Sequence, residues 1–191
     1  MTERRAEADE AAIEEYTIGE PVRIDGPITL AEADPRWAAE FVQESARVRA
    51  VLGERVLALE HVGSTSVPGL AAKPIIDMVL AVEDSADEDA YVPAMEAAGY
   101  VLRVREPDWH EHRLFKGPDR DINPHVFTAG DTEIDRMCRF RDVLRTDANA
   151  LATYQATKRE LASRTWRYVQ NYADAKNDVI DAILGESRSD R

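Results

Sequence analysis

The segment HVGSTSVPGLAAKPIIDMVLAV, residues 61–82, joins a loop rich in glycine and hydroxyl side chains to an almost wholly apolar run. Within residues 74–82, Asp77 is the one charged residue among isoleucine, methionine, valine and leucine. A continuous apolar run of this length is typical of a strand that is buried on both faces. The composition of residues 63–69 indicates a loop. We therefore expect a loop followed by a buried strand that carries one carboxylate.

The neighbouring segments extend this unit into an α+β core. Asp34-Pro35 resembles a helix start, apolar residues then recur at helical spacing, and Gly53 marks the helix end. Further expected elements are a strand at 55–62, a helix at 91–98, a strand at 100–105, and a hairpin of strands 110–116 and 121–128. The result is a short, mixed, mainly antiparallel sheet with helices on one face.

The amino-acid composition and the hydrophobic pattern of the chain change near both ends. Residues 1–16 are acidic and rich in alanine, which predicts a flexible segment or a frayed helix. Two long helical patterns, at about 135–166 and 167–185, carry no strand signal. The predicted organisation is a flexible segment 1–16, a core 17–131, and a helical C-terminal extension 132–191 packed on that core.

Composition narrows the class of protein. The chain has 191 residues and a formal charge of −13, which argues against a nucleic-acid partner held by a broad basic surface. Arginine outnumbers lysine among its basic residues, twenty to four, which fits a GC-rich genome or a salt-rich cytoplasm. Neither a membrane span nor a signal peptide is expected, and Cys138 is the one cysteine. We expect a cytoplasmic protein with no membrane partner.

The sharpest chemical feature is the loop Gly63, Ser64, Thr65 and Ser66 followed by Asp77. Glycine permits a tight turn, and hydroxyl and backbone N–H groups can cradle phosphate oxygens. A carboxylate in a buried strand is costly unless it pairs with a cation or holds a metal. The loop is neither a Walker motif nor a nucleophile elbow. The alternative is a hydroxyl-rich turn beside a structural Asp77–Lys73 salt bridge.

Residues 60–77, EHVGSTSVPGLAAKPIID, closely resemble the GrpB family, which belongs to the polymerase-beta-like nucleotidyltransferase superfamily. Related domains occur fused to dephospho-coenzyme A kinases. The resemblance covers about residues 17–185 and continues in Gly99-Tyr100, Arg113-Leu114-Phe115, Asn123-Pro124-His125-Val126, residues 140–145, Tyr154 with Lys158, and Tyr172 with Lys176. It implies a nucleotidyltransferase-like sheet with flanking helices and a helical C-terminal extension.

The superfamily resemblance also implies a mechanism. A Gly-Ser turn holds nucleotide phosphates, and carboxylates two residues apart on the next strand hold two divalent cations. Gly63-Ser64 match the turn and Asp77 matches the first carboxylate, but Val79 stands where the second should be. Valine offers no hard oxygen ligand. We therefore expect Mg²⁺ or Mn²⁺ at Asp77, with Glu111 or His125 completing the ligand set.

Other residues complete the candidate site. Lys73 is expected to neutralise charge, and His125 to act as a base or to contact phosphate; a hydrogen-bonded structural histidine is the alternative. A transition-metal cluster of His110, His112 and His125 is formally open. From the extension, the resemblance selects Arg141, Lys158, Tyr172 and Lys176 for nucleotide binding. Ion pairs within helices, or aromatic core packing, are the alternatives.

Two functions of different class follow. The first is an enzyme that transfers an NMP group from an NTP to an unknown acceptor, with Asp77, His125 and Lys73 in catalytic roles. The second is an inactive module of the same fold that binds a nucleotide or a phosphorylated small molecule. Val79 favours the second, whereas Asp77 beside Lys73 favours the first. An assembly protein without a ligand is the third possibility.

Overall fold

The computed structural model describes residues 10–186 of the chain. Its centre is a five-stranded sheet of order β2-β3-β6-β5-β4, in which β3 and β6 are parallel and the other neighbours antiparallel. The strands are β2 (Ala58–Val62), β3 (Ile76–Val82), β4 (Val101–Glu106), β5 (His112–Lys116) and β6 (Ile122–Thr128). The mixed, mainly antiparallel sheet predicted from the sequence is confirmed.

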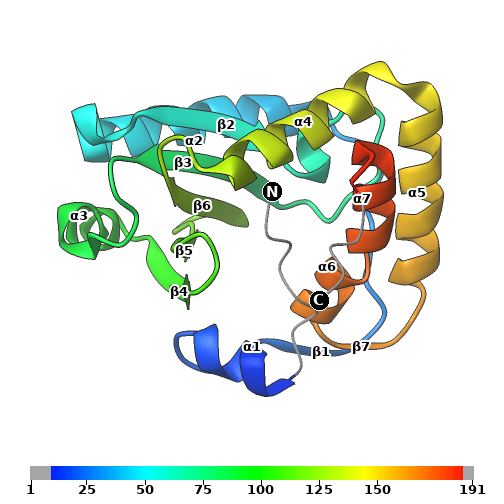
Figure 1. The fold of residues 1–191 in the computed structure, drawn as a ribbon, viewed down its shortest axis with the longest axis horizontal. Helices are drawn as coiled ribbons and strands as arrows, with labels where there is room; N and C mark the ends of the chain where they lie inside the picture. The colour runs from blue at the N-terminus through cyan, green and yellow to red at the C-terminus, as the bar shows by residue number, and fades with distance from the viewer. Residues whose placement is uncertain (1–9, 187–191) are drawn as a thin grey trace.

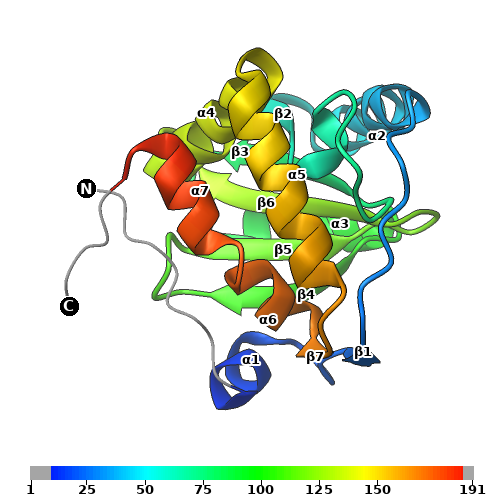
Figure 2. The same ribbon diagram turned by 90° about the vertical axis from the view of Figure 1, so that its right-hand side faces the viewer.

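Helices cover both faces of this sheet, not one. On one face, α2 (Arg36–Leu52) and α3 (Val92–Ala97) pack on Ile76, Met78 and Leu80 of β3. On the other, α4 (Thr132–Thr146) covers an apolar cluster that includes Val79. Figure 2 shows α5 (Ala148–Ala162), α6 (Val169–Asp174) and α7 (Asn177–Leu184) in front of the strands. The single-face prediction is wrong because β3 is apolar on both sides and each side needs a cover.

The C-terminal extension differs from the two long helices expected. Asp147 interrupts the first pattern, because its carboxylate accepts hydrogen bonds from the N–H groups of Asn149 and Ala150 and so caps α5. The extension also contains a strand, β7 (Trp166–Tyr168), which pairs with β1 (Arg23–Gly26). Non-local pairing of this kind leaves little trace in a three-residue segment.

The N-terminal segment is ordered where the structure describes it. Glu10–Tyr16 forms α1, in which Ile13 is buried. Figure 1 shows α1, β1 and β7 together at one end of the molecule. The remainder of the predicted flexible segment, residues 1–9, lies outside the described residues. Among residues 10–186 no helix is long and apolar enough to cross a membrane.

Candidate functional site

Asp77 is the centre of the candidate site. It is the second residue of β3, and its side chain is 29% exposed although its strand neighbours are buried. Its Oδ1 atom accepts a hydrogen bond of 2.7 Å from Asn123 Nδ2, across the parallel pair of β3 and β6. His125 Nε2 lies 3.6 Å from the same oxygen. Burial raises the pKa of Asp77, but His125, Asn123 and Lys73 outweigh it, so the pKa lies below the usual value.

Gly63 is fixed by its closeness to this carboxylate. Its φ is 68°, and a Cβ atom built there would lie 2.6 Å from Asp77 Oδ2 and 2.9 Å from Asp77 Cβ. Any side chain would therefore have to displace Asp77, besides adopting a left-handed backbone. The loop and the carboxylate predicted to share one site do so.

All four lysines of the chain interact electrostatically with Asp77. Lys73 precedes β3, Lys116 ends β5, Lys158 lies in α5, and Lys176 lies between α6 and α7. We call these four side chains and Asp77 the Asp77–lysine cluster. Many of the twenty arginines, by contrast, form ion pairs with nearby carboxylates.

The cluster holds more positive charge than Asp77 balances. Burial and the charge of Lys176 lower the pKa of Lys158 to about 7, and burial and the charge of Lys73 lower the pKa of Lys176 to about 8. Asp121 also faces Lys73 and Lys116, and Asp174 faces Lys176. Burial is the first cause of both shifts, and the repulsion between ammonium groups adds to it.

Two lysines are also held by specific contacts. Lys158 Nζ donates a hydrogen bond of 2.7 Å to the carbonyl oxygen of Ala71, and Lys116 Nζ one of 2.7 Å to Asn123 Oδ1. Since Asn123 also donates to Asp77, one amide links a lysine to the central carboxylate. The positions of these ammonium groups are therefore set by the fold.

The four loop residues divide into two roles. Gly63 and Ser64 lie at the site, and the Ser64 hydroxyl hydrogen-bonds the buried Tyr154, whose pKa is nevertheless raised by burial. Thr65 Oγ1 donates to the Ile75 carbonyl at 2.9 Å and Ser66 Oγ to the Gly63 carbonyl at 2.6 Å. Thr65 and Ser66 are buried, so they shape the loop from behind.

Tyr172 lies against the cluster. Lys176 Nζ sits 4.6 Å from the centre of its ring, a cation–π contact. The ring is buried, and its hydroxyl finds no hydrogen-bond partner among residues 10–186. A buried phenol normally has a partner. This oxygen is therefore an unsatisfied polar atom enclosed in the core beside the cluster.

Arg141 is engaged elsewhere. Its guanidinium donates to Glu60 Oε2 at 2.7 Å and to the His61 carbonyl at 3.0 Å, and also pairs with Asp142. These contacts attach α4 to β2. The neighbouring Arg145 donates to the Ser66 carbonyl at 2.8 Å and so holds the back of the loop. The structure does not bring Arg141 into the Asp77–lysine cluster.

Glu111 is separated from Asp77. Because β5 runs antiparallel to β6, Lys116 lies near Asn123, whereas Glu111 precedes the opposite end of β5. Its carboxylate pairs with Arg113 at 3.2 Å. The expectation that Glu111 completes a ligand set at Asp77 does not agree with this placement.

The donor set does not fit a resident divalent cation. Within residues 10–186, no three His, Cys, Asp or Glu side chains converge as metal ligands would. His110 pairs with Asp131 at 2.7 Å, which takes it out of the proposed histidine cluster. Around Asp77 the neighbours are an amide, an imidazole and four ammonium groups, which repel a bare cation.

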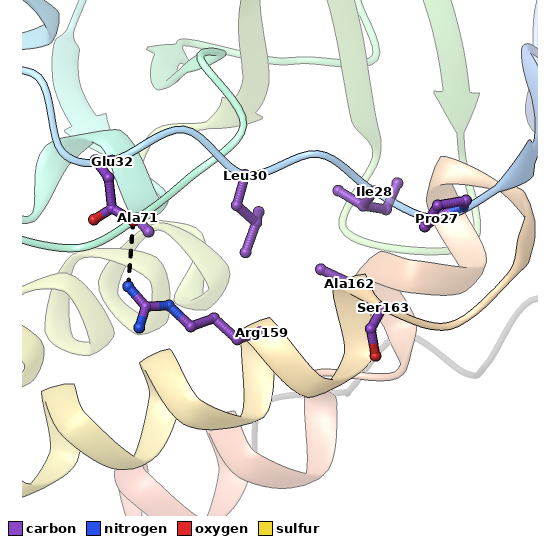
Figure 3. Close-up of a pocket in the computed structure, with 8 residues that line it drawn as sticks. All are labelled: Pro27, Ile28, Leu30, Glu32, Ala71, Arg159, Ala162 and Ser163. Carbon is purple, nitrogen blue, oxygen red and sulfur yellow. Dashed lines mark hydrogen bonds and ion pairs between the residues drawn. The ribbon is translucent and has the colours of Figure 1, made fainter.

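A shallow groove of the surface lies away from this site. It has a volume of about 320 Å³ and runs between the segment 27–32 and α5 (Figure 3). Its two charged side chains, Glu32 and Arg159, pair with each other at 3.4 Å. None of the predicted site residues lines it. The rest of its lining is mainly apolar.

Sequence reasoning missed two parts of the site. Lys116 was not selected, although the scarcity of lysine was itself the signal: where twenty of 24 basic residues are arginine, each lysine is a candidate for a special position. Glu106 was also missed; it is buried and lies 2.8 Å from His112 Nδ1. Its position in a strand gives no sign of that contact, which depends on the pairing of β4 with β5.

Comparison with known proteins identifies relatives over most of the chain. The sequence model of the GrpB protein family matches residues 27–186. The UPF0157 protein BH1888 of Halalkalibacterium halodurans is 57% identical over 172 residues, which cover 90% of this chain and 88% of that protein. The crystal structure of the conserved protein GrpB from Enterococcus faecalis matches with a TM-score of 0.71 and 30% identity, covering 82% of this chain and 98% of that one.

The chain is also similar to part of a longer protein. A protein of Mycolicibacterium paratuberculosis named dephospho-CoA kinase is 31% identical over 176 residues. The match covers 78% of this chain but 43% of that protein. More than half of that protein therefore has no counterpart in the aligned region.

Proposed function

This chain belongs to the GrpB family, and we propose that it binds a nucleotide or another phosphorylated small molecule at the Asp77–lysine cluster. The single observation that carries the proposal is the convergence of all four lysines on one carboxylate. In a chain of net charge −13, gathering ammonium groups in one place has an energetic cost. A bound phosphate removes that cost, because its oxygens accept charge-assisted hydrogen bonds.

The surroundings suit a ligand that is more than inorganic phosphate. The loop residues Gly63 and Ser64 allow close approach to the backbone. The aromatic rings of Tyr154 and Tyr172 flank Lys158 and Lys176. Such rings favour an organic group beside the phosphate, such as a base or a ribose.

Nucleotidyl transfer is a second candidate. It is favoured by the partly exposed Asp77 carboxylate next to the Gly63-Ser64 turn, the arrangement from which the superfamily resemblance starts. The relative named dephospho-CoA kinase adds a phosphorylated coenzyme to the ligands worth testing. Since the lysines oppose a bare cation, Mg²⁺ or Mn²⁺ would have to arrive on the negatively charged polyphosphate of a nucleotide. Asp77 would then be its protein ligand.

Calorimetry with the full chain tests binding. Pyrophosphate, each NTP and dephospho-coenzyme A are titrated with and without Mg²⁺. Lys158→Met and Lys176→Met should each weaken binding by about 10- to 100-fold, the equivalent of roughly 1.5–3 kcal/mol for a lost hydrogen bond to a charged group. The matched control is Arg164→Met, which removes one positive charge from an exposed pair with Glu160.

The outcomes separate the readings. Equal affinity in Lys158→Met and Arg164→Met would refute the assignment of the site. If label is transferred from an α-labelled NTP in the presence of metal, and the transfer is lost in Asp77→Asn, the chain is a nucleotidyltransferase. If no phosphorylated compound binds to the wild-type chain, the proposal fails.

A further inference from the structure

A chain of hydrogen bonds runs from the buried side chain of Glu106 to the edge of the candidate site. Glu106 Oε2 lies 2.8 Å from His112 Nδ1, and His112 Nε2 lies 3.1 Å from His125 Nδ1. His125 Nε2 then faces Asp77 Oδ1 at 3.6 Å. The side chains of Glu106 and His112 are 6% and 4% exposed, and that of His125 is 21% exposed. The relay is closed to solvent at one end and open at the site.

The sheet sets this geometry. Glu106 and His112 are paired residues of β4 and β5, and Leu114 of β5 pairs with His125 of β6. The His112 ring lies nearly parallel to the ring of His125, at 5.2 Å between ring centres, and stacks on the ring of Phe127, at 4.8 Å. Each of its two ring nitrogens is also held by a hydrogen bond, one with Glu106 and one with His125. The relay is therefore held by three strands and needs no mobile loop.

The bonds determine which nitrogen carries the proton. An ionised carboxylate only accepts, so Glu106 selects the His112 tautomer with the proton on Nδ1. His112 Nε2 is then an acceptor, and His125 must donate to it from Nδ1. In a neutral His125 ring, Nε2 is left with a lone pair that faces the site.

Where His125 is protonated it lowers the pKa of Asp77, but the distance between the two side chains fits the neutral ring. A proton donated by His125 to a carboxylate would draw the two atoms to about 2.7–2.9 Å. They lie 3.6 Å apart, and Asp77 Oδ1 takes its hydrogen bond from Asn123 instead. Two acceptors therefore lie almost in contact, and because both side chains are partly exposed, a hydroxyl group can approach them from the solvent side.

We propose that Glu106 and His112 are positioning residues that hold His125 with its Nε2 lone pair directed into the site, where it accepts the proton of a ligand hydroxyl. The inference rests on the proposed function, and it deepens it: beside a phosphorylated ligand, the site takes an alcohol or water as second reactant. His125 is then a catalytic base, and the chain is an enzyme that forms a phosphoester from an alcohol or hydrolyses a phosphoanhydride with water.

The step balances with these two reactants. The O–H bond of the hydroxyl breaks, and its proton goes to His125 Nε2. The electron pair of that bond forms the new bond from oxygen to phosphorus. The bond from phosphorus to the leaving oxygen breaks with its electron pair, and phosphate or pyrophosphate departs as an anion beside the lysine side chains.

Nuclear magnetic resonance of the full chain with ¹⁵N-labelled histidine tests the relay. Long-range ¹H–¹⁵N correlations distinguish the two neutral tautomers, and His125→Gln identifies the signals of His125. We expect the proton of neutral His112 and His125 on Nδ1, whereas imidazole in water prefers Nε2. A wild-type spectrum with the His125 proton on Nε2 overturns the proposal. A doubly protonated His112 donating to His125 would give that result.

A pair of substitutions at one position sharpens the test. Glu106→Gln keeps an oxygen that accepts from His112 Nδ1, so the tautomers should be retained. Glu106→Leu removes the acceptor, and the Nδ1–H signature of His125 should be lost. If Glu106→Leu does not fold, His112→Phe removes the acceptor for His125 directly and preserves a flat ring. Retention of the signature in the acceptor-deficient variant overturns the relay.

The failure of this inference differs from the failure of the proposed function. Calorimetry with pyrophosphate reports on the lysines, and the tautomers report on Glu106 and His112. Pyrophosphate binding with the His125 proton on Nε2 overturns the relay and leaves the binding site. The expected tautomers without binding of any phosphorylated compound overturn the binding site, and with it the base role of His125.

Discussion

Asp77 and Val79 lie on the same face of β3, two residues apart, in opposite environments. The Asp77 side chain is 29% exposed and is surrounded by polar groups. Val79 is fully buried with Val62 and Phe127, beneath Ile134 and other residues of α4. The boundary between site and core therefore falls within one strand, between these two positions.

This difference bears on the proposed nucleotidyl transfer. That reaction would call for a second metal ligand two positions after Asp77, and here that position lies under a helix. Val79 is covered by apolar side chains from α4. What remains at Asp77 is a carboxylate among lysines, which suits an anion better than a pair of cations.

The largest expected effect comes from changing Val79 to match Asp77. Val79→Asp places a carboxylate in an apolar cluster without a cationic partner, so we expect a loss of about 4 kcal/mol or more in the free energy of unfolding. Val79→Ala removes volume only and should cost about 2 kcal/mol. Urea unfolding of both variants measures this. A folded Val79→Asp variant of wild-type stability would show that position 79 opens to the site.

An intermediate effect is expected at Gly63, on the Asp77 side of the boundary. Gly63→Ala combines a left-handed backbone with overlap against Asp77, so it should cost about 2–5 kcal/mol. Gly69→Ala is the matched control, because Gly69 has a similar φ of 80° but no atom within 4 Å of a built Cβ. It should cost about 1–2 kcal/mol. Equal losses would mean that closeness to Asp77 contributes nothing.

The smallest expected effect is on the pH dependence of stability. Burial holds the pKa of Lys158 at about 7 and that of Lys176 at about 8, below the usual 10.5. Between these values and 10.5 the unfolded chain binds more protons, so stability should rise with pH from 7 to 9.5. We expect a positive slope of the free energy of unfolding against pH over this range.

Substitution checks the origin of that slope. Lys158→Met should reduce the gain between pH 7 and 9.5, whereas Arg164→Met should retain it, since Arg164 lies in an exposed pair. Chemical denaturation at several pH values measures both. Stability that is flat or falls over this window in the wild-type chain would contradict a strained lysine cluster.

Much of the fold could be predicted locally. The apolar run around Asp77 predicted β3, and the Asp34-Pro35 and Gly53 signals bracket α2. The helical extension begins at Thr132, as the change from strand patterns to helical patterns indicated. The break at Asp147 and the three residues of β7 were missed, because a cap inside a continuous helical pattern and a short strand with a distant partner depend on contacts that local periodicity does not contain.

The sequence by itself determined the strands of the central sheet, the glycine turn, and which residues bear charge, because these depend on side-chain type and local spacing. It also contained the scarcity of lysine. Only the tertiary structure decided that Lys73, Lys116, Lys158 and Lys176 meet at Asp77, that α4 covers Val79, and that Glu106 reaches His125 through His112. These contacts join segments that are far apart in the chain, and they follow from strand pairing and helix packing. Bringing distant residues together has a cost in chain entropy, and no local sequence pattern reports it.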